Sequence, residues 1–115
     1  ECTVADTRLM NVARDLALPR LAALAARAHS MVSVDTGPAH LAGAMNCPLV
    51  VLYGSAGWGR WLPRTPGAQV IALGQSEIDP QRTLLDLSAQ DVIYAWLQLA
   101  GRTKTSALEA KAAWL

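Results

Sequence analysis

The sequence predicts an α/β fold in which a small parallel sheet is flanked by helices. Short apolar segments rich in β-branched residues alternate with segments of helical pattern, which is the order expected of βαβ units. The run Leu49–Tyr53 is apolar at every position, which is typical of a strand covered on both faces. A polar turn at Asp35–Pro38 separates a strand from a helix. Three or four strands are expected, enough for one lobe.

The composition fits a single domain and excludes several kinds of partner. The chain has 115 residues, of which 52% are hydrophobic, and this supports a packed core. Ten Lys and Arg against nine Asp and Glu give a net charge of +1, and the basic residues are scattered, so we expect no nucleic-acid partner. No apolar stretch reaches the roughly 18 residues of a membrane span, and no signal peptide opens the chain. Because the chain begins with Glu1 rather than Met, we expect it to be part of a longer protein.

The two cysteines, Cys2 and Cys47, do not form a metal-binding pattern. Neither lies in a CxxC or Cys/His spacing of the kind that binds zinc. Cys47 lies between a predicted helix and a predicted strand, where we expect a buried free thiol. This cysteine usage fits a reducing cytoplasm better than a secreted scaffold.

The first half of the chain predicts two helices and two strands. Residues 1–17 have no clean period and are expected to form a short strand or an irregular arm. Pro19–His29 is a predicted helix with proline in its first turn, and Met31–Val34 is a predicted strand. A second helix is expected from Ala39 to about Asn46, ended by the left-handed tolerance of asparagine. The apolar face of the first helix comprises Leu21, Leu24, Ala25 and Ala28.

The second half predicts one further strand and one or two helices. Residues 54–68 form a loop rich in Gly and Pro, Gln69–Leu73 a third strand, and residues 74–87 mostly loop. A capping box at Ser88–Asp91 opens a helix that runs to about Ala100 and is ended by Gly101. The tail from Arg102 holds a second capping-box pattern, Ser106 to Glu109, which predicts a last short helix. The buried stripe of the longer helix is expected to comprise Val92, Leu97 and either Ile93 or Trp96.

The turn Asp35–His40 is the main functional candidate. It follows a strand and leads into a helix, and α/β sheets bind ligands at such loops. A helix that begins at Pro38 or Ala39 points unpaired N–H groups and the positive end of its dipole toward this crevice. Such a helix start is a ready anion site. Diphosphate is the anion that the arrangement best suits.

The side chains of the turn extend this prediction. Gly37 lets the backbone approach a phosphate closely, because it has no Cβ. Thr36 can cap the helix or donate to an oxyanion, and His40 can donate to a phosphate oxygen. Asp35 would repel a diphosphate unless it accepts loop N–H groups or sugar hydroxyls. The competing interpretation is that Asp35 and Thr36 only cap a helix, for about 1 kcal/mol, and that His40 is an ordinary surface histidine.

The stretch DTGPAHLAGAMNCPLVVLYGSAG, residues 35–57, resembles the signature of the glycosyltransferase family of ADP-heptose:lipopolysaccharide heptosyltransferases. Its members carry an acid, Ser or Thr, Gly, Pro or a variable residue, a further variable residue, and then His-Leu-Ala. A small-residue helix, a proline, an apolar strand and a Gly-containing loop follow. The flanking segments LPRLAALAARAHSMVSVD and LSAQDVIYAWLQLA are similar to the family's lead-in and closing helix. The resemblance covers most of residues 16–100. The chain departs from it at residues 54–57, Gly-Ser-Ala-Gly, where the family often has Gly-Pro-Thr.

The resemblance implies a GT-B architecture of two Rossmann-like lobes, with residues 1–115 as the single C-terminal lobe that binds the nucleotide sugar. It implies inverting transfer of heptose from ADP-heptose to a lipopolysaccharide core acceptor held with the missing lobe. The catalytic base is expected on that missing N-terminal lobe, so this chain alone should be inactive. Cytoplasmic localisation and peripheral association with the inner membrane are expected. The donor-binding residues implied are Asp35, Thr36, Gly37, Pro38 and His40.

No metal and no cofactor are expected, because no Asp-x-Asp pair is present to bridge a diphosphate through a metal. Cationic side chains would then assist the helix start, and Arg60 and Arg64 are candidates. Trp58 and Trp61 flank Arg60 and could stack on adenine, on a sugar or on the guanidinium plane. The competing interpretation is a solvated arginine with tryptophans that pack their own loop or the missing lobe.

Two alternative functions remain open at the level of the sequence. A Rossmann-like lobe with a phosphate-binding turn could be a non-catalytic nucleotide-binding module. The same donor turn would also serve a heptosyltransferase that acts on protein rather than lipid.

Overall fold

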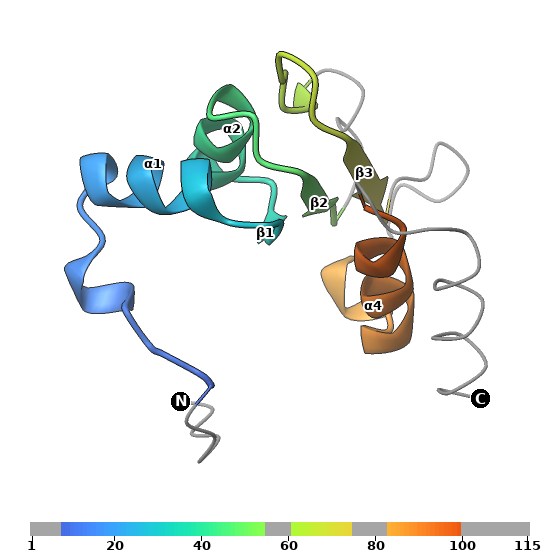
Figure 1. Cartoon of the computed structure of the whole chain (residues 1–115). Helices are drawn as coiled ribbons and strands as arrows, with labels where there is room; N and C mark the ends of the chain where they lie inside the picture. Colours follow the sequence, from blue (N-terminus) through green and yellow to red (C-terminus); the bar gives the residue numbers. More distant parts are fainter. Residues whose placement is uncertain (1–7, 55–60, 75–82, 100–115) are drawn as a thin grey trace.

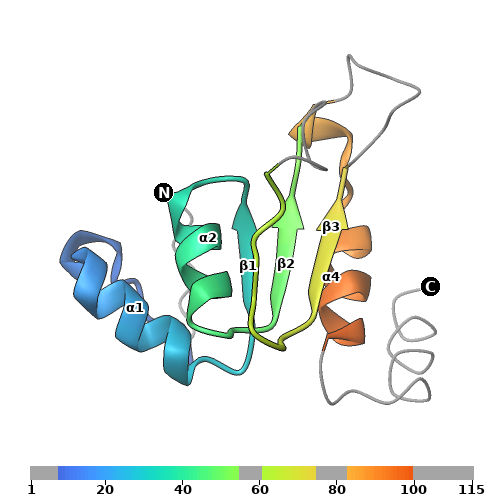
Figure 2. The same ribbon diagram turned by 90° about the horizontal axis from the view of Figure 1, so that it is seen from above.

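The computed structural model describes residues 8–54, 61–74 and 83–99. Its three strands form one parallel sheet in the order β1-β2-β3 (Figures 1 and 2). The elements in chain order are η1 (Ala13–Asp15), α1 (Leu18–Arg27), β1 (Met31–Val34), α2 (Gly37–Ala44), β2 (Leu49–Leu52), β3 (Val70–Leu73), η2 (Leu84–Asp86) and α4 (Ala89–Gln98), where η denotes a 3₁₀ helix.

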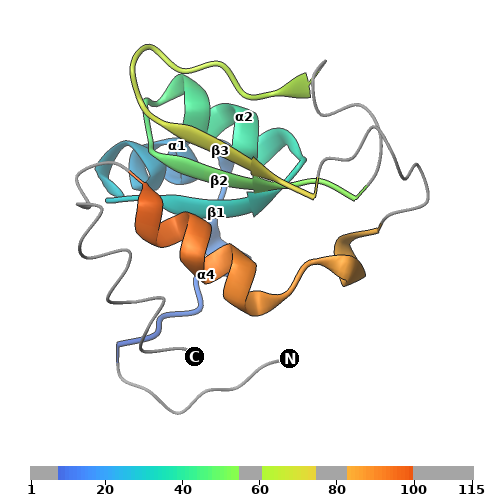
Figure 3. The same ribbon diagram turned by 90° about the vertical axis from the view of Figure 1, so that its right-hand side faces the viewer.

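Helices cover both faces of the sheet, so the predicted α/β class is confirmed. In Figure 3 the helices α1 and α2 lie on one side of the sheet and α4 lies on the other. Helix α2 packs on β1 and β2, and α1 packs against α2, while α4 packs on β2 and β3. The result is a three-layer, Rossmann-like arrangement with β2 at its centre.

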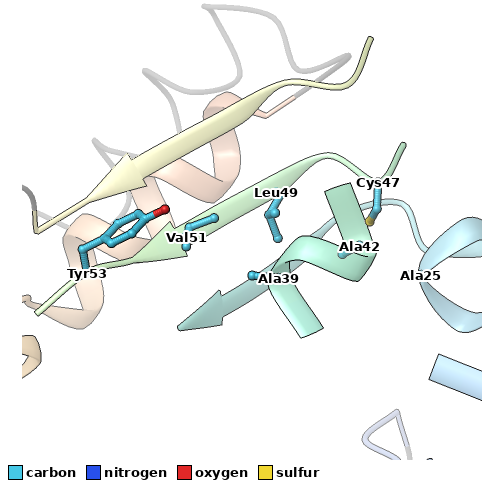
Figure 4. Packing of buried hydrophobic residues seen from close by; sticks show 7 residues of the cluster. All are labelled: Ala25, Ala39, Ala42, Cys47, Leu49, Val51 and Tyr53. Atoms are coloured by element: carbon cyan, nitrogen blue, oxygen red, sulfur yellow. The ribbon is translucent and has the colours of Figure 1, made fainter. Parts of the chain in front are cut away.

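The central strand β2 is buried on both faces, as its continuous apolar run predicted. Leu49 and Val51 point toward α2, and Tyr53 continues the same side (Figure 4). Val50 points to the opposite face, where it packs with Ala95 and Leu99 of the α4 segment. Three of the four residues of β2, Leu49, Val50 and Val51, have no exposed surface. The alternation of side chains along a strand thus fills two separate core clusters.

Helix α2 ends at Ala44, two residues before the predicted end, and Asn46 is the left-handed residue that follows it, as predicted. Asn46 has a φ of +60°, in the left-handed region that asparagine tolerates. The N–H of Cys47 donates to the carbonyl of Ala42 at 3.0 Å, and the N–H of Asn46 donates to that of Gly43 at 2.9 Å. This pair of bonds is a Schellman motif. The amide oxygen of Asn46 also accepts from the N–H groups of Gly67 and Ala68 at 3.0 and 2.8 Å, which ties the loop before β3 to α2.

Two predicted helix faces differ from the structure. Leu24 was expected on the buried face of α1, but it is 49% exposed, and Ala25 is the buried residue of that helix. In α4, Ala95 and the C-cap Leu99 are buried, whereas Val92, Ile93, Trp96 and Leu97 are only partly buried. The small side chains of Ala25 and Ala95 allow α1 and α4 to pack closely. The predicted faces were chosen mainly by their large apolar residues, so the importance of these alanines was not recognised.

The predicted N-cap of α4 is confirmed in part. The Ser88 hydroxyl accepts from the N–H of Asp91 at 3.1 Å, and it donates to the Asp91 carboxylate at 2.7 Å. Helix α4 ends at Gln98, before the predicted Ala100. A complete capping box lies instead at Thr83 and Asp86, in a segment predicted to be mostly loop, where it opens η2. The expected pattern Ser106 to Glu109 lies outside the described residues, as do Cys2 and Gly101.

Cys47 is a buried free thiol, as predicted. Burial raises its pKa above the ordinary value of 9.0, because the apolar surroundings disfavour the thiolate. Among the described residues, no helix is long and apolar enough to cross a bilayer.

Candidate functional site

The candidate site lies at the edge of the sheet where the parallel strands end. The N–H of Asp35 donates to the carbonyl of Leu52 at 3.1 Å, and the N–H of Tyr53 donates to that of Leu73 at 2.9 Å. These bonds extend the strand pairing by one residue and place Asp35 next to the end of β2. Ligands of open α/β sheets bind at this edge.

Helix α2 begins at Gly37, earlier than the predicted start at Pro38 or Ala39. The N–H groups of Ala39 and His40 both donate to the carbonyl of Thr36, at 3.0 and 3.4 Å. Pro38 has no N–H. The helix start is therefore less rich in free donors than predicted, because the chain itself satisfies two of them. The N–H groups of Thr36 and Gly37 remain without a hydrogen bond in the described chain.

Gly37 faces open space. A Cβ placed on it would meet no atom within 4 Å other than those of the adjacent residues and of the helix's own backbone. The adjacent residues Thr36 and Pro38 are exposed. The backbone at Gly37 is thus accessible from outside. This is the geometry that close approach of an anion to the backbone requires.

No side-chain hydrogen bond caps the start of α2. Thr36 occupies the N-cap position, but its hydroxyl donates back to the carbonyl of Val34 at 3.3 Å. The helix is therefore not capped in the way that the competing interpretation of Asp35 and Thr36 required. Its positive end is left to water or to a ligand.

Asp35 lies against His40, an arrangement that the sequence analysis did not consider. The distance from His40 Nε2 to Asp35 Oδ1 is 3.7 Å, and both side chains are partly exposed. The carboxylate is thus turned toward the imidazole rather than toward loop N–H groups. A protonated His40 would offset the charge of Asp35, and the two would then be neutral together.

Tyr53 is a residue of this edge that the sequence analysis missed. It is buried, and its hydroxyl donates to the carbonyl of Trp61 at 3.3 Å. Burial raises the pKa of Tyr53 above 10.0, and the negative charge of Asp35 raises it further. The signal was available, because the residue after β2 must lie beside the residue after β1 in a parallel pair. It was taken only as the last apolar residue of the strand.

Of the two cationic candidates, Arg64 lies among the described residues, and its backbone is near the end of α2 that is opposite the turn. The backbone carbonyl of Arg64 lies 3.0 Å from a Cβ built on Gly43, near the C-terminal end of α2. Six residues separate Gly43 from Gly37, which is roughly 9 Å along the helix axis. Trp58 and Arg60 lie outside the described residues. Where the structure describes the chain, no three His, Cys, Asp or Glu side chains gather as metal ligands would.

The family model of glycosyltransferase family 9 (heptosyltransferase) matches residues 2–88. The match includes the turn Asp35–His40 and ends just before α4. Comparison with curated proteins and with solved structures gives no match. Because the matched residues make up most of the chain, the resemblance seen in the sequence is confirmed: the chain belongs to glycosyltransferase family 9, the heptosyltransferase family.

Proposed function

We propose that the chain is the donor-binding half of an inverting glycosyltransferase that transfers heptose from ADP-heptose to a lipopolysaccharide core acceptor. Membership of family 9 supports glycosyl transfer, and the three-layer parallel sheet fits one lobe of a GT-B enzyme. Asp35, Thr36, Gly37, Pro38 and His40 form the donor site in this proposal. The general base belongs to a second lobe, so residues 1–115 alone do not catalyse transfer.

The observation that carries the proposal is the open, uncapped start of α2. Gly37 is exposed at the carboxyl edge of the sheet, its N–H makes no hydrogen bond in the described chain, and the space that a Cβ would occupy is open. A diphosphate there would receive this hydrogen bond together with the positive end of the helix dipole. The stabilisation grows in the transition state, because negative charge then develops on the β-phosphate oxygen that is losing its bond to the sugar.

The contact between Asp35 and His40 suggests how the acid and the phosphate share one turn. The carboxylate of Asp35 lies 3.7 Å from Nε2 of His40. His40 can therefore stand between the carboxylate and a bound diphosphate. In this arrangement Asp35 also remains able to accept hydroxyl hydrogens from the sugar, which is one of the two alternatives that the sequence left open. Arg60 and Trp58 would complete the site from the next loop, and no metal is required.

The whole enzyme would act at the cytoplasmic face of the inner membrane, where the lipid acceptor is extended. The alternatives are a non-catalytic nucleotide-binding module and a heptosyltransferase that acts on protein. Incubation of the complete enzyme with ADP-heptose and each class of acceptor separates these functions. Transfer to protein alone rejects the lipid acceptor, and absence of any transfer favours the module.

Binding of ADP tests the donor site on this chain. We expect saturable amide shifts in NMR spectra at residues 35–40, and His40→Ala should weaken ADP binding about fivefold or more, the effect of one charge-assisted hydrogen bond. His29→Ala is the matched control, because His29 is the other histidine and precedes β1, at the opposite edge of the sheet. Unchanged spectra at millimolar ADP would reject the site.

A further inference from the structure

We propose that Trp61 is the surface on which the adenine of the donor stacks, and that Tyr53 holds Trp61 at the carboxyl edge of the sheet. The inference rests on the proposed function, because it names the place of the adenosine within the same donor site. Neither residue belongs to the turn Asp35–His40. The donor site would therefore extend from the end of β1 to the end of β2.

Tyr53 lies directly beside the turn. The register pairs Val34 with Leu52, so Tyr53 is the neighbour of Asp35 on the next strand, and neighbouring strands lie about 4.8 Å apart. The negative charge of Asp35 raises the pKa of Tyr53, in agreement with this closeness. The ring of Tyr53 is buried on the α2 side of β2, in the same cluster as Ala39 from the first turn of α2 (Figure 4).

The backbone of Tyr53 is fixed from the side of β3. Its N–H donates to the carbonyl of Leu73 at 2.9 Å. Its own carbonyl lies against Gly74, which has a φ of +83° and leaves no room there for a Cβ. With a paired backbone and a buried ring, Tyr53 is a rigid point to which another segment can be attached.

Trp61 is attached to this point. The hydroxyl of Tyr53 donates to the backbone carbonyl of Trp61 at 3.3 Å. Two residues further on, Pro63 is buried, and its Cβ lies 3.1 Å from a Cβ built on Gly43 of α2. In Figure 3 the segment from residue 61 to β3 runs along the α2 side of the sheet. The backbone at Trp61 therefore lies between two anchors, Tyr53 and the contact of Pro63 with α2.

The side chain of Trp61 is exposed although its backbone is held. It is 58% exposed, whereas tryptophan is highly buried on average. Packing within its own loop, one of the interpretations that the sequence left open, therefore does not account for this residue. An indole on a fixed backbone is suited to stacking, because little ordering is needed when a planar ligand binds. Each nucleotide base offers such a planar π face.

The adenosine, rather than the sugar, is the part of the donor that reaches Trp61. A nucleotide sugar carries its two ends on either side of the diphosphate. In the proposed site the sugar hydroxyls lie toward Asp35, which follows β1. Trp61 is held from Tyr53, which follows β2. The two ends of the donor would thus be bound at the ends of two neighbouring strands.

The test compares ADP with inorganic diphosphate as ligands of the 115-residue chain, followed by NMR. Trp61→Ala should lower ADP affinity about tenfold, the effect of one stacked base, and leave diphosphate affinity unchanged. Trp61→Phe should restore most of the ADP affinity, because it keeps an aromatic face. His40→Ala, by contrast, should weaken both ligands. In the unmodified chain the indole N–H of Trp61 should shift with ADP and not with diphosphate.

A double-mutant cycle tests the positioning role of Tyr53. Tyr53→Phe keeps the buried ring and removes the hydrogen bond to Trp61, so we expect ADP affinity to fall about threefold with diphosphate affinity unchanged. If Tyr53 acts through Trp61, the double variant should bind ADP as Trp61→Ala alone does. Additive losses would overturn the positioning role.

Two matched controls lie away from the carboxyl edge. Met10→Ala truncates a large side chain that is 82% exposed on the arm before α1. Tyr94→Phe removes a tyrosine hydroxyl from α4, on the opposite face of the sheet. Both should bind ADP like the unmodified chain. Equal losses in these controls would overturn the proposal, as would a loss of diphosphate affinity in Trp61→Ala.

The outcomes separate this inference from the proposed function. Unchanged ADP affinity in Trp61→Ala, with shifts at residues 35–40 intact, would reject the adenine surface alone and assign the indole to a contact outside this chain. A shift of the Trp61 indole by ADP without any response at residues 35–40 would reject the proposed diphosphate site alone. Absence of both responses would reject both.

Discussion

Gly37 is a glycine that the fold itself does not require. Its backbone does not need a glycine, because φ is not in the left-handed region and an added Cβ would meet nothing within 4 Å. The absence of a side chain there instead keeps the start of α2 open. Gly74 is the opposite case. It has a φ of +83° and no room for a Cβ against the carbonyl of Tyr53, so the fold itself requires it.

Gly37→Ala should therefore separate binding from stability. We expect the free energy of unfolding to stay equal or to rise slightly, because alanine favours a helix more than glycine does. We expect ADP affinity to fall about tenfold, because the methyl group would occupy the space through which a phosphate reaches the N–H. Urea unfolding and NMR titration measure the two effects. Gly67→Ala is a suitable control, because its Cβ would make ordinary contact and lies away from the turn. Equal ADP affinity in Gly37→Ala would show that no ligand approaches this backbone.

Asn46 combines two roles that different substitutions can separate. Its backbone adopts a left-handed φ, and its side chain binds the N–H groups of Gly67 and Ala68. Asn46→Gly keeps the backbone freedom but loses both hydrogen bonds, for about 1–2 kcal/mol. Asn46→Ala also carries the cost of the left-handed conformation and should lose about 2–4 kcal/mol.

Asn46→Asp should be the mildest change at this position. The carboxylate can still accept both hydrogen bonds and tolerates the left-handed region, with a small penalty at the negative end of α2. Midpoints of urea unfolding rank the three variants. If Asn46→Gly were as stable as the unmodified chain, the link between α2 and the loop before β3 would contribute nothing to stability.

At the scale of elements, the strands were predicted well and the details of the helices less well. The runs Met31–Val34 and Leu49–Leu52 are short and almost wholly apolar, so their length and their composition both predicted strands. The start of α2 was placed one or two residues late because Pro38 was taken as the first helical position, whereas it occupies the second. The capping box at Thr83 was missed because the helix that it opens has a single turn.

The site was predicted in position but not in its internal contacts. The order of strand, turn and helix places Asp35–His40 at the carboxyl edge of a sheet, and topology alone determines that. The pairing of Asp35 with His40 depends on side-chain orientation, which no sequence pattern encodes. The same holds for the turn of the Thr36 hydroxyl toward Val34, which leaves the helix uncapped. The donor-binding role of these residues stays a prediction.

At the scale of the whole molecule, the two sides of the sheet are unequally covered. Helix α4 packs on β2 and β3 but leaves Val32 and Val34 of β1 exposed. Large apolar side chains are also exposed on α1 and on the arm that precedes it, at Leu9, Met10 and Leu18.

The stability of the whole domain should fall as the solution becomes alkaline. Burial raises the pKa of Cys47 above 9.0, and burial together with Asp35 raises that of Tyr53 above 10.0. Both groups keep their protons in the folded state at pH values where the unfolded chain has begun to release them. The stabilisation is complete below pH 9 and is lost as the pH rises through the folded pKa values.

Urea unfolding between pH 7 and pH 11, with a thiol reductant present, measures this dependence. Cys47→Ala and Tyr53→Phe will each lower stability at pH 7, since one leaves a small cavity and the other removes the hydrogen bond to Trp61. The informative quantity is therefore the slope of the free energy of unfolding against pH, which the double variant should flatten between pH 9 and pH 11. An unchanged slope would mean that neither buried group governs the alkaline limit of the fold.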